Sequence, residues 1–510
     1  MTWRAAAGEG TGVAPGRVAR ARADLNDRLA SARSTLWRAG IRPRPRPREL
    51  LLLGFAGLTL LVGWISLESF RAGRLATGDL GPLLTYLGLL LALHAVFVIS
   101  GRRMDQILLP VTAMLGGLSL ILMSRLPQDL VVQTIAGARL QLADLQLLWL
   151  VIGFVLLGAL AILVRQDGWL RYYKYTWAAV GIVLLLLVFV LGQEVNGARL
   201  SVTIGPFTGQ PSELLKVILV VFLAAYLADN RALLARQSTR IWRINVPPLP
   251  YLLPMLVMWG IALAVVIVQR DLGAALLLFS VFLTLLYVAT RRFSYVALGT
   301  VLFLVGAFVL YHLFGHVRTR VDIWLDPYAD PLGAGYQVIR ALYAFGRGGI
   351  LGTGLGAGLP QVGTVPAIPA IHTDFVFTGL AEELGMLGGI AICGLYLVIA
   401  ERGLRIAARA GDEFQALLAA GLTLVIVLQA ALIIGGNLKL VPLTGITLPF
   451  VSYGGSSMLS NAIVIGLLLA LSDRGLGRVV PPPVRSRSAR DAAAVPVLEA
   501  ASPNPGLDAE

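Results

Sequence analysis

The feature that most constrains this chain is a series of apolar runs, each about as long as a membrane-spanning helix. A helix needs about 20 apolar residues to cross the hydrocarbon core of a bilayer. Twelve runs qualify or nearly qualify: 50–67, 81–100, 105–124, 146–164, 176–192, 213–228, 250–268, 273–290, 295–314, 384–401, 415–435 and 456–472. The break at Gln269-Arg270-Asp271 is short enough for a tight hairpin or a re-entrant turn. We therefore predict an all-α, polytopic integral membrane helix bundle with about twelve transmembrane helices.

Composition excludes several other classes of protein. Of the 510 residues, 57% are hydrophobic and 14% are charged, whereas soluble domains carry about 25% charged residues. The formal net charge of +14 could suggest nucleic acid, but the basic residues gather at the ends of apolar runs and in the two tails. We therefore expect no nucleic-acid partner. The single cysteine, Cys393, excludes a disulfide framework and a thiolate metal cluster.

The distribution of arginine predicts the domains and their orientation. Residues 1–49 contain eleven arginines and read as a disordered, Arg-rich arm, while residues 50–473 form the membrane domain and 474–510 a disordered tail. The positive-inside rule places both termini in the cytoplasm. On that orientation, two long loops lie outside the membrane, at about 315–383 and 436–455.

Charged residues inside membrane segments are costly, so they are candidates for function. Glu213 and Lys216 are three residues apart at the start of a run, and they either pair to hold the helix end or line a substrate path. Asp271 is either the N-cap of the next helix or a functional group. His312 and His316 could offer two nitrogens to a metal ion. A plain interfacial pair is preferred for them, because the sequence supplies no third ligand.

The outer loop contains a glycine-rich run at 346–358. Such glycines could let backbone amides approach a phosphate. The run contains no GxxxxGK[ST] pattern and opens no dinucleotide fold, so ATP or NAD binding is unsupported. A flexible loop is the preferred interpretation.

Three carboxylates follow at the outer end of a run, close to an imidazole in sequence. They are Asp374, Glu382 and Glu383, with His372 nearby. Desolvation at a membrane-edge cavity raises the basicity of a carboxylate, which suits a general base for a hydroxyl. Helix capping by Thr373 or Asp374 explains the same residues. From the residues alone, both interpretations remain open.

Several ordered blocks of residues resemble one protein family. The segment Phe450-Val-Ser-Tyr-Gly-Gly-Ser-Ser457 is similar to the signature of the SEDS proteins (shape, elongation, division and sporulation), which include the RodA and FtsW peptidoglycan polymerases. Further similar blocks occur in the same order: Asn196-Gly-Ala-Arg199, Gln210-Pro-Ser-Glu213 with Lys216, Asp271-Leu-Gly273, Asp326-Pro-Tyr-Ala-Asp-Pro331, Gly335-Tyr-Gln337, His372-Thr-Asp374 and Glu382-Glu-Leu-Gly385. The resemblance covers about 145–473. It implies a SEDS core of ten spans, here with two extra N-terminal helices, most like a twelve-helix RodA.

The resemblance implies a reaction and its setting. SEDS proteins polymerise lipid II on the outer face of the bacterial cytoplasmic membrane, in support of cell shape, elongation or division. They transfer the glycan from undecaprenyl pyrophosphate to the 4-hydroxyl of an incoming GlcNAc, with inversion at the anomeric carbon. The family's essential aspartate falls on Asp374, the expected base. The expected partner is a class B penicillin-binding protein transpeptidase, within membrane lipids. No cofactor is certain, although a divalent cation, Mg²⁺ or Mn²⁺, could assist.

Charge and loop placement indicate further candidates to bind substrate. Four arginines of the outer loop could meet the pyrophosphate, since arginine forks match phosphate geometry: Arg318, Arg320, Arg340 and Arg347. The other expected substrate-binding residues are Glu213, Lys216, Asp271, Gln337, His372, Thr373, Glu382, Glu383, Ser452, Gly454, Gly455 and Ser456. Four positions depart from the family pattern: Ser201 replaces a tryptophan, Arg270 a proline, Ala370 a glutamate, and Thr444 a lysine of FtsW-like members. The last departure favours the RodA-like assignment.

A lipid II flippase or other transporter is the alternative function. Broken helices and intramembrane charges are equally natural in a carrier. A carrier needs polar groups near the membrane midplane, whereas a base at Asp374 on the outer face serves chemistry. A non-catalytic scaffold would need no protonatable group at that position.

Overall fold

The computed structural model describes residues 43–475, apart from 136, 165–166, 196–197, 205–206, 237–238, 242–243, most of 247–269, 359–360 and 363–364. The described α-helices are α2 (Pro47–Ala72), α3 (Gly81–Ser100), α4 (Leu108–Arg125), α5 (Leu142–Leu163), α6 (Gly168–Tyr172), α7 (Lys174–Leu191), α8 (Pro211–Arg236), α10 (Leu272–Thr290), α11 (Phe293–Leu313), α12 (Gly315–Leu325), α13 (Tyr336–Gly348), α14 (Val376–Arg409), α15 (Glu413–Asn437) and α16 (Gly455–Gly475). The predicted disordered segments lie almost entirely outside the described residues.

The long helices form because apolar side chains surround them on every side, which is typical of segments buried in protein or lipid. Their ends follow local chemistry. α2 has Pro47 at its first position, where a missing N–H costs nothing, and ends before Gly73 in the left-handed conformation. The helix therefore begins at Pro47, inside the segment predicted as an arm.

Ten helices in the described part of the chain are long and apolar enough to cross a membrane. Each of them matches one of the predicted runs, so the all-helical, multi-pass membrane class is confirmed. The run predicted at 176–192 corresponds to α7, which contributes a shorter apolar helix, Lys174–Val188. The run predicted at 250–268 lies mostly outside the described residues. The count of twelve spans remains a prediction.

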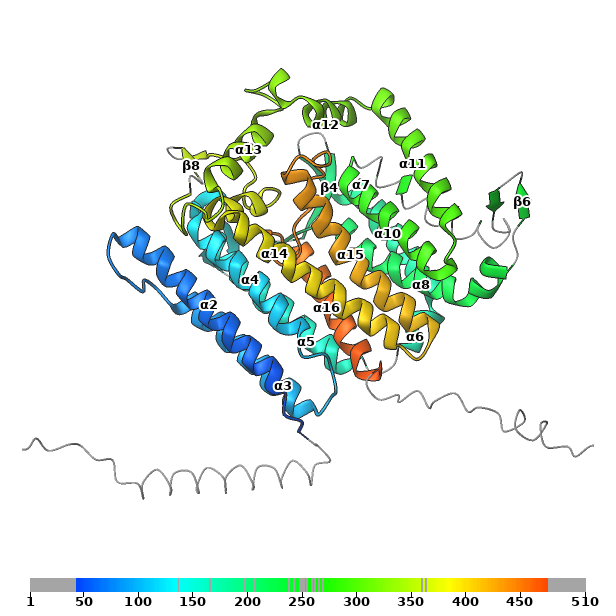
Figure 1. Cartoon of the computed structure of the whole chain (residues 1–510), viewed down its shortest axis with the longest axis horizontal. Coiled ribbons are helices and arrows are strands. Elements are labelled where there is room, and N and C mark those ends of the chain that lie inside the picture. The colour runs from blue at the N-terminus through cyan, green and yellow to red at the C-terminus, as the bar shows by residue number, and fades with distance from the viewer. Residues whose placement is uncertain are drawn as a thin grey trace, which may run out of the picture.

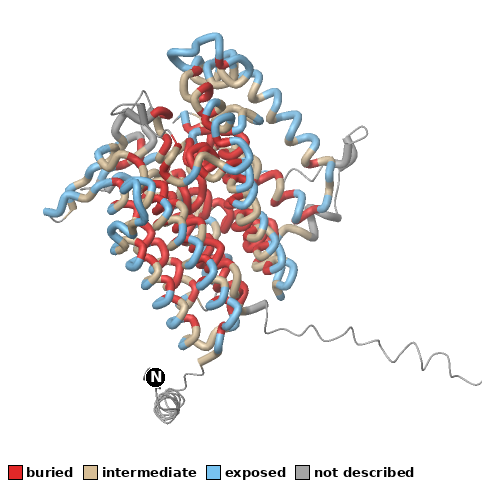
Figure 2. Tube along the Cα trace, turned by 60° about the vertical axis from the view of Figure 1, so that its left-hand side comes forward, coloured by how far each residue is buried: buried red, intermediate tan, exposed pale blue. Residues whose placement is uncertain are grey.

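The helices pack side by side into one bundle (Figure 1), and α4, α8, α15 and α16 are the most buried of the long apolar helices described. α16 packs on α5, α14 on α15, and α15 on α8, while α2 lies on α4 and α3 on α5. Figure 2 shows the buried residues concentrated in the middle of the bundle. α11 is the least buried spanning helix and stands at the periphery. The chain enters α2 and leaves α16 at one end, whereas α12 and α13 cover the other (Figure 1).

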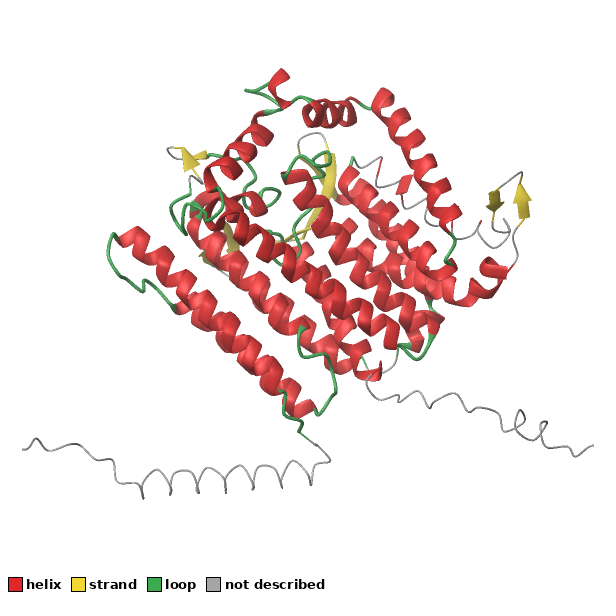
Figure 3. Ribbon diagram, viewed as in Figure 1, coloured by secondary structure: helices red, strands yellow, loops and turns green. Residues whose placement is uncertain are grey.

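Short antiparallel strands connect some of the helices (Figure 3). They form a hairpin of β1 and β2, a three-stranded sheet in the order β3-β4-β5, a hairpin of β6 and β7, and a hairpin of β8 and β9. Their bounds are β1 (Gln133–Ile135), β2 (Ala138–Leu140), β3 (Gly192–Val195), β4 (Ala198–Ile204), β5 (Phe207–Gly209), β6 (Thr239–Ile241), β7 (Ile244–Val246), β8 (Gln361–Val362) and β9 (Val365–Pro366). The sequence patterns did not predict these strands. Apart from β4, which has seven residues, each has four residues or fewer and is too short to show alternation.

α14 is kinked at Gly385, and this glycine is required there. Gly385 has φ 71° and ψ −172°, and a methyl group on it would lie 2.2 Å from the backbone nitrogen of Gly352. The helix begins at Val376, earlier than the predicted start at 384. Glu382 and Glu383 therefore lie within α14 and not in the outer loop, which corrects the prediction.

Candidate active site

Asp374 lies in a tight turn immediately before α14. The backbone N–H groups of Thr373, Asp374 and Phe375 donate to one acceptor, the carbonyl oxygen of Ala370, at 3.1, 2.9 and 3.3 Å. Ala370 has φ 55°, which closes the turn. α14 begins after Phe375 without a side-chain cap. The capping interpretation of Thr373 and Asp374 is therefore wrong, and the Asp374 carboxylate is free for another role.

The Asp374 carboxyl is partly enclosed, and this changes its basicity. Burial raises the pKa of Asp374 from 3.8 to about 6, against the opposing effects of a hydrogen bond with Thr373 and the positive charge of Arg320. Such a group is ionised at neutral pH yet more basic than an ordinary aspartate, which suits a general base. Burial lowers the pKa of neighbouring His372. The imidazole is therefore neutral at pH 7, and its buried Nδ1 has no hydrogen-bond partner among the described residues.

The segment that resembles the SEDS signature is hydrogen-bonded to the backbone of this turn. The Ser452 hydroxyl donates to the carbonyl of Thr373 at 2.5 Å and accepts from the N–H of Leu448 at 2.8 Å. The N–H of Tyr453 donates to the carbonyl of His372 at 2.8 Å. These bonds tie the loop before α16 to the two residues that precede Asp374. Ser452 therefore positions the turn through its backbone.

The two glycines of the signature serve the start of α16. α16 begins at Gly455, where a methyl group would lie 2.4 Å from the Trp149 ring. Gly454 and Ser456 flank this first residue, and the next hydroxyl, Ser457, shares a 2.5 Å hydrogen bond with Thr447. The signature glycine at 455 is thus explained by close packing of α16 on α5.

Asn437 also holds the Asp374 turn, and the sequence patterns did not identify it. Its Nδ2 donates to the carbonyl of Asp374 at 3.1 Å and to the carbonyl of Ile433 at 2.9 Å. Its Oδ1 accepts from the Thr378 hydroxyl at 3.2 Å. A polar side chain directly after the apolar run 415–435 was the available signal.

Arg320 of α12 is the cation beside Asp374. Its Nη1 donates to the carbonyl of Thr444 at 2.9 Å, which fixes the guanidinium over the loop before the signature. Gly445 lies between the two groups. A methyl group on this residue would be 3.5 Å from Arg320 Nη2 and 3.9 Å from Asp374 Oδ2. These are ordinary van der Waals distances, so it is the backbone conformation, with φ 70°, that favours glycine here.

The other three predicted arginines have different surroundings. Arg318 lies over the Tyr311 ring at 5.4 Å, and Arg340 over the Tyr336 ring at 5.1 Å. Arg347 forms an ion pair with Glu382. The predicted residue Gln337 lies near Arg320, because both line a cavity of about 60 Å³. The four arginines do not converge on one point.

Glu382 and Glu383 are occupied by protein groups near the kink of α14. Both are buried. Glu382 pairs with Arg347, and Glu383 Oε1 lies 3.3 Å from Nε of Arg125. Glu383 also accepts from the N–H of Gly356 at 3.1 Å. The glycine-rich run therefore binds a carboxylate of its own chain, and the three predicted carboxylates divide into a separate Asp374 and a buried glutamate pair.

A metal site is not formed by these residues. The described part of the chain contains no group of three or more histidine, cysteine, aspartate or glutamate side chains able to hold a metal ion. His312 contacts the rings of Phe308 and Tyr311, with centroids 4.6 and 5.2 Å away. His316 lies by Phe314 at 5.6 Å. Both histidines therefore pack against aromatic rings, and the interfacial interpretation stays a prediction.

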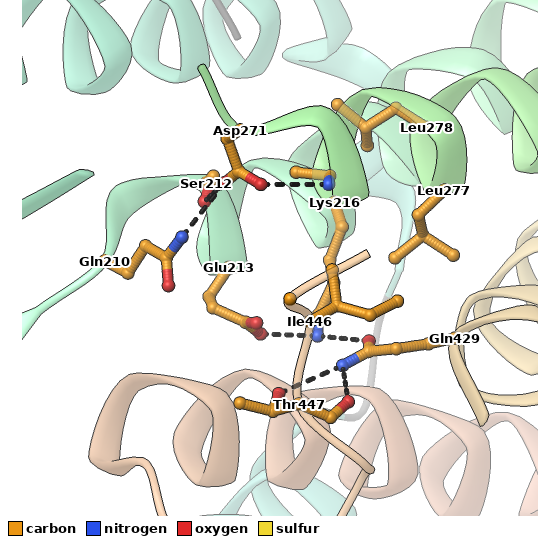
Figure 4. A pocket seen from close by; sticks show the side chains of 12 residues that line it. Gln210, Ser212, Glu213, Lys216, Asp271, Leu277, Leu278, Gln429, Ile446 and Thr447 are labelled. Carbon is orange, nitrogen blue, oxygen red and sulfur yellow. Dashed lines mark hydrogen bonds and ion pairs between the residues drawn. The ribbon is translucent and has the colours of Figure 1, made fainter. Parts of the chain in front are cut away.

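Glu213 and Lys216 belong to a second, buried polar cluster (Figure 4). Lys216 Nζ donates to Glu213 at 2.5 Å, to Gln429 at 2.8 Å and to Asn461 at 3.2 Å. The Ser460 hydroxyl donates to Glu213 at 2.9 Å. The predicted ion pair is confirmed, and its remaining hydrogen-bonding capacity is met by polar side chains of α15 and α16.

Asp271 caps the next helix, as one interpretation predicted. Its Oδ1 accepts from the N–H of Ala274 at 3.0 Å at the start of α10. Its Oδ2 accepts from Ser212 at 3.0 Å and from Gln210 at 2.9 Å. Asp271 thereby joins the starts of α8 and α10.

The buried cluster reaches the Asp374 region through one loop. A small cavity of about 30 Å³ lies among Glu213, Lys216, Asp271 and the loop 445–447 (Figure 4). Gln429 Nε2 donates to the carbonyl of Thr447, the last residue of that loop, at 2.8 Å. Since the loop begins at Gly445, the cluster supports the backbone between Arg320 and Asp374. The observed contacts support the fold, and the substrate-binding role of Glu213, Lys216 and Asp271 stays a prediction.

A large apolar groove adjoins the site. Its volume is about 920 Å³, and it runs between α10 and α11 to Arg320, Trp324 and the loop 441–444. Leucine and phenylalanine side chains form most of its wall. Arg320 borders the groove and also lies beside Asp374. An apolar chain bound in the groove would thus end at Arg320, next to the Asp374 carboxylate, whose pKa is raised.

The sequence comparison decides the family. Residues 103–475 match the family model for FtsW, RodA and SpoVE, described as cell cycle proteins. The chain belongs to the FtsW/RodA/SpoVE family. The resemblance seen in the signature segment is thereby confirmed.

Individual relatives agree with this membership. The peptidoglycan glycosyltransferase RodA of Mycobacterium tuberculosis H37Rv is 37% identical over 460 residues, which cover 90% of this chain and 96% of the relative. The RodA of Mycobacterium leprae is 36% identical over 84% of this chain and 91% of the relative. The probable FtsW of Thiomicrospira cyclica is 35% identical over 62% of this chain and 78% of the relative.

Solved structures share the fold. A chain from a peptidoglycan synthase complex that coordinates polymerization and crosslinking matches with a TM-score of 0.58 and 26% identity, over 74% of this chain and 99% of that chain. A variant of the rod shape-determining protein RodA of Thermus thermophilus matches with a TM-score of 0.50, over 73% and 98%. This member of the FtsW/RodA/SpoVE family is a multi-pass membrane peptidoglycan glycosyltransferase, similar in sequence to RodA.

Proposed function

We propose that the chain polymerises lipid II by a single inverting displacement, with Asp374 as the general base. The proton of the acceptor 4-hydroxyl passes to the Asp374 carboxylate as the oxygen attacks the anomeric carbon of the donor. The new C–O bond forms while the bond to the pyrophosphate oxygen breaks. The electron pair leaves with undecaprenyl pyrophosphate.

The observation that carries this proposal is the position of Asp374. Asp374 is half-buried in the turn before α14, and burial raises the pKa of its carboxyl to about 6. A base with that pKa is ionised near neutral pH while retaining more affinity for a proton than an ordinary aspartate. Ser452 and Asn437 hold the turn through the backbone on both sides of it, so the carboxylate is oriented before substrate arrives.

Arg320 and the apolar groove are proposed to bind the donor. The groove between α10 and α11 has a volume of about 920 Å³ and an apolar wall, which suit a polyprenyl chain. Arg320 lies at its end, where the pyrophosphate would follow the chain. A guanidinium stabilises the charge that develops on a departing phosphate oxygen. For Mg²⁺ or Mn²⁺ the described residues offer no ligand set at this point, so the proposed step does not include one.

We also propose the finer topology. Twelve spans follow if α7 and the run at 250–268 cross the membrane together with the ten long helices. α2 and α3 precede the family region, which begins at 103, and are proposed as two extra N-terminal helices. Both termini and the arms 1–49 and 474–510 would be cytoplasmic, and Asp374 extracytoplasmic. A class B penicillin-binding protein transpeptidase is the proposed partner, because a matching chain comes from a complex that joins polymerization to crosslinking.

The test uses the purified full-length chain with its partner transpeptidase and labelled lipid II. We expect the wild-type protein to form glycan chains and Asp374→Asn to lose at least about 100-fold in rate, the low end for loss of a general base. Asp129→Asn is the matched control, since Asp129 is an exposed aspartate on a short 3₁₀ helix of this chain. Polymer formed at the wild-type rate by Asp374→Asn would contradict the base assignment. Lipid II that crosses a liposome bilayer without polymer would support the flippase alternative instead.

A further inference from the structure

A further cavity lies at the end of the bundle where the chain enters α2 and leaves α16, opposite the end covered by α12 and α13 (Figure 1). Its volume is about 370 Å³. It is enclosed by the first turn of α2, the segment before α4, the last turns of α14 and the end of α16. Four arginines and one aspartate supply the charge of its lining: Arg48, Arg402, Arg405, Arg409 and Asp105.

Two of these arginines have unused hydrogen-bonding capacity. Arg402 binds Asp105 with its Nε 2.9 Å from Oδ2, and Arg405 pairs with Glu401. Arg48 and Arg409 are exposed and form no ion pair or side-chain hydrogen bond with the described residues. Two guanidinium groups, from α2 and α14, therefore border the same cavity without an anion.

Hydrogen bonds around Asp105 fix one side of the cavity, the segment before α4. Asp105 Oδ1 accepts from the N–H groups of Ile107 and Leu108 at 2.8 and 3.1 Å. The N–H of Asp105 donates to the Ser472 hydroxyl at 2.9 Å. The buried Arg46 side chain donates to the carbonyl of Asp105 at 2.8 Å. The segment before α4 is thus fixed to α16 and to the start of α2.

One further polar group of the lining lacks a partner. Gln106 lines the cavity, and its amide Oε1 is buried without a hydrogen-bond partner in the described part of the chain. Side-chain amide oxygen and nitrogen are interchangeable by a rotation of the group, so this end can equally present donors. An anion bound in the cavity beside Gln106 would give the amide a partner.

We propose that this cavity binds the phosphate headgroup of an anionic glycerophospholipid. Basic pockets between membrane helices are suited to such headgroups, because the guanidinium forks bind the phosphate while the acyl chains remain in the bilayer. Met104, Ile107 and Ile406 supply an apolar side to the cavity, which suits a glycerol and the first part of an acyl chain better than a free anion. The cavity joins α2 to the family core at α14, so a bound lipid would bridge the N-terminal helices and the catalytic body.

The test measures lipid binding to the purified full-length chain by native mass spectrometry. Phosphatidylglycerol is titrated against phosphatidylcholine, whose headgroup carries the same phosphate without net charge. We expect Arg48→Gln/Arg409→Gln to weaken phosphatidylglycerol binding roughly 30-fold, the factor given by about 1 kcal/mol for each of two basic groups at a membrane surface. The matched control is Arg103→Gln/Arg291→Gln, which removes the same charge from exposed arginines outside the cavity.

The possible results separate the alternatives. Selective loss of phosphatidylglycerol in the cavity variant, with the control within about twofold of wild type and Arg48→Lys/Arg409→Lys largely intact, supports the site. Equal weakening in the two glutamine variants would overturn it, since general surface charge would then explain the binding. Displacement of the lipid by millimolar inorganic phosphate would also overturn it, because the cavity would then be a site for a free anion.

Discussion

Replacing Arg320 with glutamine should shift the pH dependence of polymerisation to higher pH. The Arg320 guanidinium and the Asp374 carboxylate each lie within 4 Å of one point beside Gly445, so they are no more than about 8 Å apart. At that separation two unit charges interact by about 2 kcal/mol at an effective dielectric constant of 20 and by about 0.5 kcal/mol in bulk water. Because 1.36 kcal/mol equals one pKa unit, loss of the cation should raise the pKa of Asp374 by about 0.4 to 1.5 units.

The sign follows from the protonation state that the reaction needs. The Asp374 pKa already lies near 6 because burial disfavours the charged form, and the positive charge of Arg320 opposes that rise. Without the cation, more of the carboxyl is protonated at pH 6 to 7 and cannot accept the hydroxyl proton. The acidic limb of the rate profile should therefore move upward in pH, in addition to any fall in the maximal rate caused by weaker stabilisation of the leaving pyrophosphate.

The assay is the value of kcat/KM for lipid II between pH 5 and 8.5, which reports the pKa of the free enzyme's essential base. Arg318→Gln is the control, because Arg318 lies on the same helix but over the Tyr311 ring. Wild type and this control should share an acidic limb near pH 6. An unchanged limb in Arg320→Gln, or an equal shift in the control, would refute the assignment of Arg320 as the cation that acts on Asp374.

Two further predictions concern the support of the site. Ser452→Ala should lower kcat by about 10- to 100-fold with little change in KM, because the Thr373 carbonyl loses its donor and a small displacement of a catalytic group is costly. Ser280→Ala, which removes a hydroxyl bonded within α10, should behave as wild type in the same steady-state assay, and equal losses would show that the Ser452 bond does not position the turn. Lys216→Met should destabilise the fold by about 3–5 kcal/mol, since it leaves the carboxylate of Glu213 in the interior without its cation. Thermal unfolding in detergent measures this, and Glu213→Gln combined with Lys216→Met should recover part of the loss; a single variant as stable as wild type would contradict it.

The candidate site was predictable in part, and the reason is visible in particular residues. Asp374 and Ser452 stand in short blocks that resemble a known family, so their importance could be recognised without a fold. The role of Ser452 could not, because its hydroxyl meets a carbonyl 79 positions earlier in the chain. Asn437 was missed for the same reason, since a single amide after an apolar run gives no indication of which backbone group it contacts. The glutamate pair was placed in a loop, because the kink at Gly385 conceals the early start of α14.

The sequence by itself indicated a multi-pass helical membrane protein, the family it resembles, and the carboxylate that is the candidate base. It could do so because apolar runs must satisfy their own backbone as helices in lipid, and because the family blocks are contiguous. Only the tertiary structure decided that Arg320, and not its three neighbours in the outer loop, lies beside Asp374, and that an apolar groove ends there. Those facts depend on how α10, α11 and α12 pack against the loop before α16, and contacts between segments so distant in the chain leave no local pattern for a reader of the sequence.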